Sequence, residues 1–383
     1  MKLNMNKSLL TAALLLPLTA LQSAVKSNNL FSDNAVLQQG KPVPVWGTAN
    51  NGEKVTVTFA GQKAETVAKG GKWKVILPAL KASSMPKMLT ITGENKVEIK
   101  NVLVGEVWVC SGQSNMGFRL KDAANATEAV AAAGDPQLRL LNVPTLAKDV
   151  PPAEVAASWS ECTSETAARF SAVAYFFGRD LRKALHVPVG LIHSSVGGTG
   201  AAEFTGPKGF ESCPEMKLLL ERYAQTVREF DPAKLAEANK KQAEKYQQDV
   251  AQAQADGKPK PRDPGPVFSP MENPHRPGGF YNGMIAPLQP YAIQGVIWYQ
   301  GEADNVSSKQ YQTLFPALIA NWRGEWNQGE FPFLFVQIAP FRATLPELRE
   351  AQLLTWKKTP MTAMAVTTDV GDATRKSQVS RGI

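Results

Sequence analysis

The sequence predicts an α/β protein in which a parallel-sheet domain follows a small antiparallel β-sandwich. Short strands separated by glycine and asparagine turns occupy residues 28–104, which is typical of a sandwich. Strands alternate with helical segments over residues 105–383, which indicates a parallel sheet with helices on both faces. The chain of 383 residues is 43% hydrophobic and 20% charged, so it is long enough for a large core shared between two domains.

The strands of the antiparallel part are predicted from an alternation of apolar and polar residues. Residues 55–59 alternate and end at the turn Ala60-Gly61, and residues 73–77 follow a pair of glycines. Residues 89–92 repeat the pattern after the next turn. We expect a structural role for this domain, with contact to carbohydrate as the alternative.

The parallel sheet is predicted from short apolar segments that lie between helical ones. A stripe of apolar residues at helical spacing covers residues 171–185, and residues 311–326 are also helical in pattern. The predicted strands are residues 102–110, 138–143, 187–192, 295–299, 333–338 and 361–367.

Residues 214–262 interrupt this alternation. They are rich in alanine, lysine, glutamate and glutamine and poor in large apolar residues, which predicts a solvent-exposed helical hairpin inserted into the second domain. We interpret its charges as a solvated face rather than a binding patch. A proline-rich loop over residues 263–279 then returns the chain to the sheet.

Residues 1–24 have the pattern of a secretory signal peptide. Lys2 and Lys7 precede the apolar stretch 9–21, which is too short to span a bilayer, and small residues follow it. We therefore expect a secreted protein, periplasmic in a Gram-negative cell, with no membrane span in the mature chain. The sequence does not determine an oligomeric state.

Charge and metal-ligand patterns exclude several classes of partner. The net charge is +8, but no cluster of lysine and arginine with interleaved aromatics predicts nucleic-acid binding. No metal site is expected, because histidine and cysteine pairs at metal-ligand spacing are missing. No cofactor is expected either, since neither a P-loop nor a dinucleotide fingerprint occurs. Cys162 and Cys213 would be able to pair in an oxidising compartment, which the sequence alone does not show.

Residues 105–116 combine a buried strand with an abrupt polar turn. They read Gly-Glu-Val-Trp-Val-Cys-Ser-Gly-Gln-Ser-Asn-Met and place Ser114 just past the end of the strand. Open α/β sheets bind their ligands at this edge, and a following helix would direct backbone N–H groups at a developing oxyanion. Ser114 is therefore a candidate nucleophile, with a plain turn and a serine N-cap as the alternative.

This block resembles the nucleophile block of the sialate O-acetylesterase family, which belongs to the SGNH (GDSL-like) hydrolase superfamily. Three further blocks match in order: Gly-Gly-Thr at 197–199, Tyr-Asn-Gly-Met-Ile-Ala-Pro-Leu at 281–288, and Trp-Tyr-Gln-Gly-Glu-Ala-Asp-Asn at 298–305. The resemblance extends from about residue 34 to about residue 372. It implies a three-layer SGNH-hydrolase-like domain and a β-rich N-terminal part packed on it.

The resemblance also implies an activity. We expect a serine esterase that removes O-acetyl groups from sialic acid or related acetylated glycans, so that an acetylated carbohydrate is the expected partner. A plant-polysaccharide acetylesterase of the xylan type is one alternative. A glycan-binding pseudoenzyme is the other.

The resemblance assigns roles to individual residues. Ser114 is the nucleophile, and its own N–H and that of Gly198 are donors of the oxyanion hole. In relatives a side-chain amide of the third block completes the hole, so we expect Gln300 in that role, with Asn305 in reserve. Glu302 is expected to orient loops by hydrogen bonds. The residues expected to line the cleft are Glu302, Arg349, His275 and Asp372.

The histidine that should act as the base is missing from its expected place. Family members carry it shortly after Asp-Val-Gly-Asp, which stands here at 369–372, but residues 373–383 contain no histidine. His186 and His193 have structural positions, whereas His275 lies in the proline-rich loop and could approach the cleft. We therefore expect impaired activity in this chain, with a frame error or a truncation as the cause.

Overall fold

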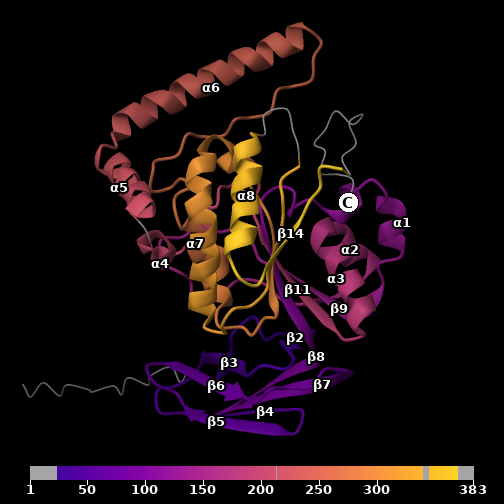
Figure 1. The fold of residues 1–383 in the computed structure, drawn as a ribbon. Coiled ribbons are helices and arrows are strands. Elements are labelled where there is room, and N and C mark those ends of the chain that lie inside the picture. Colours follow the sequence, from indigo (N-terminus) through magenta and orange to yellow (C-terminus); the bar gives the residue numbers. More distant parts are fainter. Residues whose placement is uncertain (1–23, 213, 340–344, 370–383) are drawn as a thin grey trace, which may run out of the picture.

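The computed structural model describes residues 24–212, 214–339 and 345–369, and it confirms an α/β protein built around one large mixed sheet (Figure 1). Residues 1–23 of the predicted signal peptide lie outside the described residues. The strands are β1 (Lys26–Ser27), β2 (Val36–Gln38), β3 (Val43–Thr48), β4 (Lys54–Phe59), β5 (Gln62–Val67), β6 (Lys72–Leu77), β7 (Ser83–Thr92), β8 (Lys96–Gly112), β9 (Asp135–Asn142), β10 (Ser160–Cys162), β11 (Val189–Ser195), β12 (Gly295–Tyr299), β13 (Phe333–Val336) and β14 (Thr362–Ala365).

The helices lie mostly in the second half of the chain. The α-helices are α1 (Ala126–Ala131), α2 (Ser164–Arg169), α3 (Ala172–Leu185), α4 (Pro207–Glu211), α5 (Pro214–Arg228), α6 (Pro232–Ala255), α7 (Ser308–Trp326) and α8 (Pro346–Lys358). Short 3-10 or π turns are η1 (Leu120–Asp122), η2 (Ala202–Phe204), η3 (Tyr281–Ile285), η4 (Ala286–Leu288) and η5 (Glu302–Ser307).

Strand β8 connects the two ends of the molecule (Figure 1). Its first half pairs with β7 and β2, and its second half pairs in parallel with β11 on one side and β12 on the other. Residues 102–112 are buried without interruption, as expected of a central strand that is covered on both faces. The predicted boundary between residues 104 and 105 falls inside this strand, so the division into two domains stays a prediction.

The predicted parallel sheet is present. Within the described ranges the parallel strands follow the order β9-β11-β8-β12-β13-β14, and β10 pairs antiparallel with β9 at one edge. The strands expected at 138–143, 187–192, 295–299 and 333–338 all occur, with ends that differ by a few residues. The C-terminal ends of β11, β8 and β12 therefore lie side by side at one edge of the sheet.

The N-terminal part is antiparallel, with most strands where the sequence places them. Strands β1, β3 and β6 form a separate three-stranded sheet, whereas β4, β5 and β7 extend the large sheet. Inward-facing valines from both groups belong to one hydrophobic cluster; they are Val45, Val55, Val57 and Val75.

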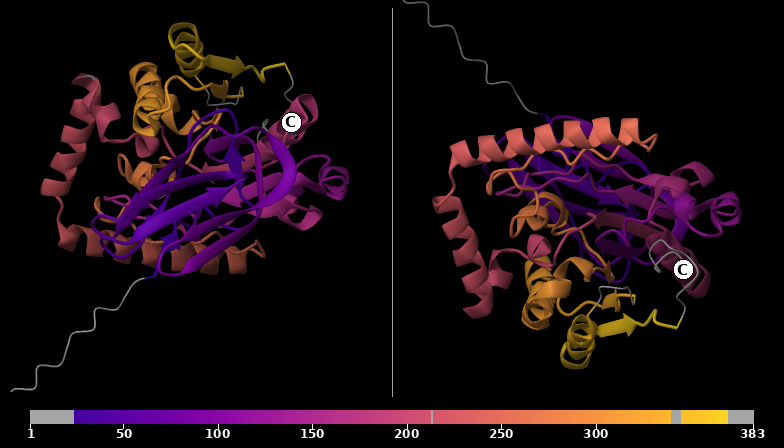
Figure 2. Two further views of the ribbon diagram at one scale, coloured as in Figure 1. Left: turned by 90° about the horizontal axis from the view of Figure 1, so that it is seen from below. Right: turned by 90° about the horizontal axis from the view of Figure 1, so that it is seen from above.

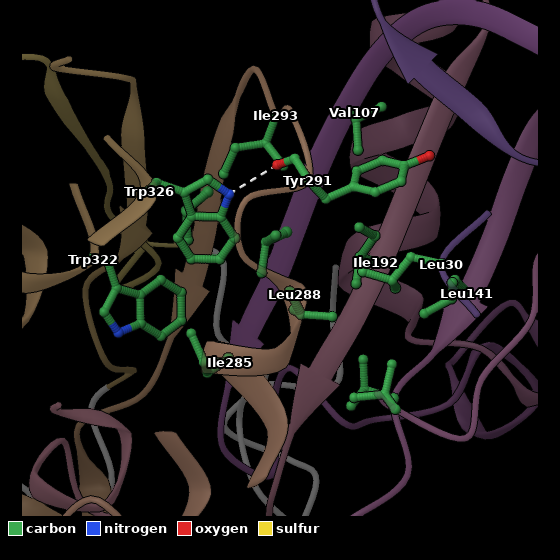
Figure 3. Packing of buried hydrophobic residues seen from close by; sticks show 14 of the residues in the cluster. Leu30, Val107, Leu141, Ile192, Ile285, Leu288, Tyr291, Ile293, Trp322 and Trp326 are labelled. Carbon is green, nitrogen blue, oxygen red and sulfur yellow. Dashed lines mark hydrogen bonds between the residues drawn. The ribbon is translucent and has the colours of Figure 1, made fainter. Parts of the chain in front are cut away.

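Two hydrophobic clusters cover the two faces of the parallel sheet. Helix α3 covers one face with Ala174 and Tyr175, and α7 covers the other with Trp322 and Trp326 (Figure 3). The indole of Trp326 donates to the carbonyl of Tyr291 (2.9 Å), whose hydroxyl in turn donates to the carbonyl of Val36 (2.7 Å). These contacts join the helical layer to the N-terminal strands.

The insertion at residues 214–262 contains two helices, α5 and α6. Helix α5 buries Met216 and contacts α4 and α7, whereas no residue of α6 is buried. Both views of Figure 2 show α6 at a wide angle to α5 rather than folded back along it. The predicted pairing of the two helices as a hairpin is therefore wrong. Helix α6 instead bonds to the proline-rich loop, where the side chain of Asn239 donates to the carbonyl of Val267 (3.0 Å) and accepts from the N–H of Val267 (2.7 Å).

We predict that α6 is dispensable for folding. Replacing residues 231–262 by a short Gly/Ser linker removes no buried side chain of α6, so the melting temperature should change little, as measured by circular dichroism. Met216→Ala is the matched control in α5 and should cost about 2 kcal/mol or more, because it leaves a cavity. Loss of soluble protein from the linker variant would contradict this assignment.

Candidate active site

The turn that carries Ser114 begins at a glycine that tolerates no side chain. Gly112 ends β8 between β11 and β12 and has φ +137°, and a Cβ atom there would overlap the carbonyl oxygen of Tyr299. The next residue, Gln113, is buried, and its N–H donates to the same carbonyl (2.9 Å). Ser114 is exposed, and Asn115 turns back into the protein. The sheet therefore presents Ser114 at its C-terminal edge.

The glycine loop after β11 lies beside Ser114. A Cβ atom on Gly197 would lie 3.7 Å from the Cβ of Ser114, and Gly198 has φ +76° with open space where a side chain would be. The hydroxyl of Thr199 donates to the carbonyl of Val196 (2.7 Å) and closes the loop. The first two sequence blocks are thus brought together.

Backbone donors are free at this point of contact. Among the residues that the structure describes, no acceptor is bound by the N–H groups of Ser114, Gly197 and Gly198, or by the hydroxyl of Ser114. Neighbouring N–H groups are used, since Gln113 bonds to Tyr299 and Val196 to Gly112. Free donors next to an exposed serine can bind a developing negative charge on a substrate oxygen.

Gln300 is buried and fully engaged, which corrects the oxyanion role expected for it. Its side-chain nitrogen donates to the carbonyl of Thr199 (3.0 Å) and to the carboxylate of Asp304 (2.6 Å), and its oxygen accepts from Tyr311 (3.2 Å). An amide nitrogen has two hydrogens, so neither is left for an oxyanion. Gln300 instead holds the glycine loop in place.

The reserve residue, Asn305, connects the third block to α8. Its side-chain oxygen accepts from the backbone N–H of Leu345 (2.6 Å), just before the helix begins. Further along α8, Gln352 is buried and donates to the carbonyl of Gln300 (3.1 Å), while Arg349 is only partly buried. The stretch 349–352 thus braces the third block through Gln352, a role that the sequence did not assign to a particular residue.

Glu302 ties the third block to the nucleophile turn. Its carboxylate accepts from the side chain of Asn115 (2.7 Å), and burial raises its pKa. The side-chain oxygen of Gln113 accepts from the N–H groups of Gly301 (3.2 Å) and Ala303 (3.4 Å). Both neighbours of Ser114 are therefore fixed by this loop, and Ser114 itself is left free.

Asp304 supports the glycine loop from the other side, which the sequence did not predict. Its carboxylate accepts from the N–H of Ala201 (2.8 Å) as well as from Gln300. Burial raises the pKa of Asp304 to about 6, although both hydrogen bonds act in the opposite direction. The only sequence signal was its place within the third block.

The three histidines have other partners or positions in the structure. His186 caps α3 in a left-handed conformation, and His193 bonds to Asn142 and Ser195. The Nδ1 atom of His275 lies 3.6 Å from Oε1 of Glu203, and hydrogen bonding to that carboxylate raises the pKa of His275. In the described residues none of them hydrogen-bonds to Ser114.

Two predicted features fall on residues that the structure does not describe. Asp372 with the segment after it, and likewise Cys213, lie outside the described ranges. Cys162 is a buried free thiol that lies 3.0 Å from the carbonyl oxygen of Ala133, so the pairing with Cys213 that the sequence allowed is not formed at Cys162.

Residues 24–212, 214–339 and 345–369 contain neither a candidate metal centre nor a candidate membrane span. No group of three or more histidine, cysteine, aspartate or glutamate side chains in these ranges is arranged to hold a metal ion. No helix in the same ranges combines the length and the apolar character that a membrane span requires.

Comparison with known proteins gives the family. A family model for carbohydrate esterases, the sialic acid-specific acetylesterases, matches residues 269–379, which include the sequence blocks at 281–288 and 298–305. Sialate O-acetylesterase of Rattus norvegicus is 30% identical over 384 residues, covering 89% of this chain and 67% of the rat protein. The chain belongs to the sialate O-acetylesterase family. It is accordingly a carboxylic ester hydrolase.

A second sialate O-acetylesterase and a solved structure are also similar to this chain. The human sialate O-acetylesterase is 27% identical, covering 89% of this chain and 65% of its own length. Among solved structures, XAC1771, a carbohydrate acetylesterase from Xanthomonas citri, is 31% identical with a TM-score of 0.73. That match covers 94% of this chain and 72% of the Xanthomonas protein. The fold around the Ser114 turn is thus shared with a carbohydrate esterase.

We predict that the buried carboxylate of Asp304 costs stability at alkaline pH. Because the pKa of Asp304 is raised in the folded state, its contribution to the free energy of unfolding is fully present below about pH 4 and is lost as the pH rises through about 6. Asp304→Asn cannot ionise, so it should melt roughly 2 °C or more above the wild type at pH 8 and close to it at pH 4. Asp249→Asn, on the exposed face of α6, is the control. A lower melting temperature of Asp304→Asn at pH 8 would show that the loop requires the charge.

Proposed function

We propose that this chain is a serine esterase that removes O-acetyl groups from sialic acid or related acetylated glycans, with Ser114 as the nucleophile and without a cofactor. The observation that carries the proposal is that Ser114 is exposed and lies against Gly197 of the glycine loop, and that the N–H groups of Ser114, Gly197 and Gly198 bind no acceptor among the described residues. Both neighbours of this serine are fixed by the third block, which is what a preorganised nucleophile needs.

The reaction that this arrangement supports is acyl transfer through a covalent intermediate. The Oγ atom of Ser114 attacks the acetyl carbonyl carbon, and the carbonyl oxygen takes up the negative charge and accepts from Ser114 and Gly198. The bond to the sugar oxygen then breaks, and the proton that the Ser114 hydroxyl gives up passes to that oxygen, which leaves as the free hydroxyl. Water attacks the acetyl-serine in the same way and releases acetate.

The substrate class rests on the family. The relatives in rat and human are named sialate O-acetylesterases, and the Xanthomonas relative is named a carbohydrate acetylesterase. We propose that this chain likewise acts on acetylated carbohydrate. A panel of O-acetylated sialic acid and acetylated xylan would rank the substrates by kcat/KM.

The proposal extends to the architecture and the compartment. We infer a three-layer SGNH-like domain, supported by α3 and α7 on opposite faces of the parallel sheet, preceded by a β-sandwich. We also infer export to the periplasm or the medium, supported by the pattern of lysines and apolar residues in 1–24.

No histidine among the described residues hydrogen-bonds to Ser114, which supports the proposal that the chain lacks the base that would activate it. His193 is bound to Ser195 and His275 to Glu203, and residues 373–383 contain no histidine. A serine hydroxyl without an adjacent base is a weak nucleophile at neutral pH. We therefore propose that these 383 residues alone hydrolyse esters slowly; a glycan-binding protein without turnover is the second candidate, favoured by the same observation.

We predict that hydrolysis of 4-methylumbelliferyl acetate depends on Ser114. Ser114→Ala should lower the rate of hydrolysis, to no more than the residual acceleration of roughly 10³–10⁴ over uncatalysed hydrolysis that binding and the free donors leave. The matched control is Ser84→Ala, an exposed serine on β7. If Ser114→Ala turns over at the wild-type rate, the nucleophile is a different residue.

We also predict that a supplied histidine raises the rate. A version extended with a family-like C-terminal segment that contains the histidine should exceed the unextended chain by roughly 10²-fold or more, because a general base contributes that much. Equal rates in both versions, combined with loss of activity in His275→Ala, would instead make His275 the base.

A further inference from the structure

A hydrogen-bonded chain of three side chains lies on the α3 face of the sheet, under the Ser114 turn. The imidazole of His193 bonds through Nδ1 to the side-chain oxygen of Asn142 (2.9 Å) and through Nε2 to the hydroxyl of Ser195 (2.7 Å). His193 and Asn142 are register partners on adjacent parallel strands, β11 and β9. Ser195 is two residues further along β11, so it points to the same face as His193.

The partners of the imidazole fix its tautomer. The side-chain oxygen of Asn142 can only accept a hydrogen bond, so the ring proton of His193 is on Nδ1. The Nε2 atom therefore accepts from the hydroxyl of Ser195. Burial lowers the pKa of His193 to about 4, so the ring is neutral at neutral pH. The hydroxyl hydrogen of Ser195 is thereby committed to His193, and its oxygen is held at one position.

That oxygen lies directly against the end of the nucleophile turn. Ser195 is the register partner of Gly112, where the turn begins. A Cβ atom on Gly117, where the turn ends, would lie 3.2 Å from the Oγ atom of Ser195. Both ends of the turn around Ser114 therefore meet Ser195.

The ring of His193 supports the segment that follows the turn. It packs edge-on against Phe170, with 5.6 Å between ring centroids. The carbonyl of Phe170 accepts from the N–H of Leu120 (2.9 Å), and the N–H of Ala172 donates to the carbonyl of Phe118 (2.7 Å). The connector from α2 to α3 is thus held between His193 and the returning chain.

We propose that Asn142, His193 and Ser195 form a positioning network that sets the geometry of the Ser114 turn for the esterase reaction. The inference rests on the proposed function, because it assigns these residues to the catalytic step of that reaction. Neither His193 nor Ser195 contacts the substrate in this scheme. They act through the backbone of residues 112–117.

His193 is a positioning residue rather than the base of Ser114. Its Nε2 atom is taken by Ser195, and its Nδ1 atom carries the proton that binds Asn142. A ring with a pKa of about 4 would also be a poor base toward an alcohol, because the best general bases titrate near the working pH.

The expected loss of rate follows from the precise position that Ser114 must hold to attack the ester. A displacement of about 1 Å in a catalytic group can lower the rate roughly 10²-fold. Ser195→Ala removes the oxygen beneath Gly117 and leaves Nε2 of His193 without a donor. His193→Phe keeps the packing against Phe170 but breaks both hydrogen bonds.

The test compares these two variants with Ser195→Thr, which keeps the hydroxyl, and with the control His186→Gln at the exposed end of α3. The readouts are kcat and KM for 4-methylumbelliferyl acetate, and the rate at which a fluorophosphonate labels Ser114. Ser195→Ala and His193→Phe should lower kcat and the labelling rate roughly tenfold to hundredfold, with KM little changed. Ser195→Thr should recover most of the loss, and His186→Gln should match the wild type.

Two outcomes would overturn the network. One is an unchanged kcat and labelling rate in folded Ser195→Ala and His193→Phe. The other is fluorophosphonate on Ser195 of the wild type, which would make that serine a nucleophile. If the wild type neither hydrolyses the ester nor is labelled at Ser114, the proposed function fails. The positioning network is then tested on its own by the hydrogen-exchange protection of the backbone amides of residues 113–117. Equal protection in wild type and Ser195→Ala would then contradict it.

Discussion

The site depends on the absence of a side chain at Gly112. This residue ends the central strand where β11 and β12 close in on both sides, and any Cβ atom would overlap the carbonyl of Tyr299. Only a glycine lets the chain turn sharply there, since its φ of +137° lies in a region that other residues avoid. The exposed position of Ser114 two residues later follows from that turn.

Buried hydrogen bonds then fix everything around the serine except the serine itself. Asn115 is bound to Glu302, and Gln113 accepts from the third block. Gln300 holds the glycine loop. A buried polar group left without a partner costs about 1–3 kcal/mol, so each bond resists displacement of the loops. The groups left free are the hydroxyl and the backbone donors, which supply the nucleophile and the oxyanion-binding groups of ester hydrolysis.

Much of the fold could be predicted from local patterns, and most of the site geometry could not. The apolar segments that became β9, β11, β12 and β13 are visible as strands because a buried parallel sheet needs continuous apolar runs. The placement of α6 along the proline-rich loop depends on hydrogen bonds such as those between Asn239 and Val267, which composition alone did not reveal.

Side-chain roles depend on partners that are distant in the chain. Gln300 has the residue type and the place of an oxyanion donor, but Thr199 and Asp304 use both of its N–H bonds. The bonds made by Gln352 and His193 likewise join separate elements of the fold, so no sequence pattern reveals them. Ser114 could be predicted because its block is contiguous in the sequence.

The central claim is that Ser114 carries the acetyl group during turnover. Rapid acid quenching of the protein during hydrolysis of an activated acetyl ester, followed by peptide mapping with mass spectrometry, measures this directly. The account predicts acetyl on the peptide that contains Ser114 and no acetyl there in Ser114→Ala. Acetyl on another serine, with none on Ser114 while acetate is released, would contradict it.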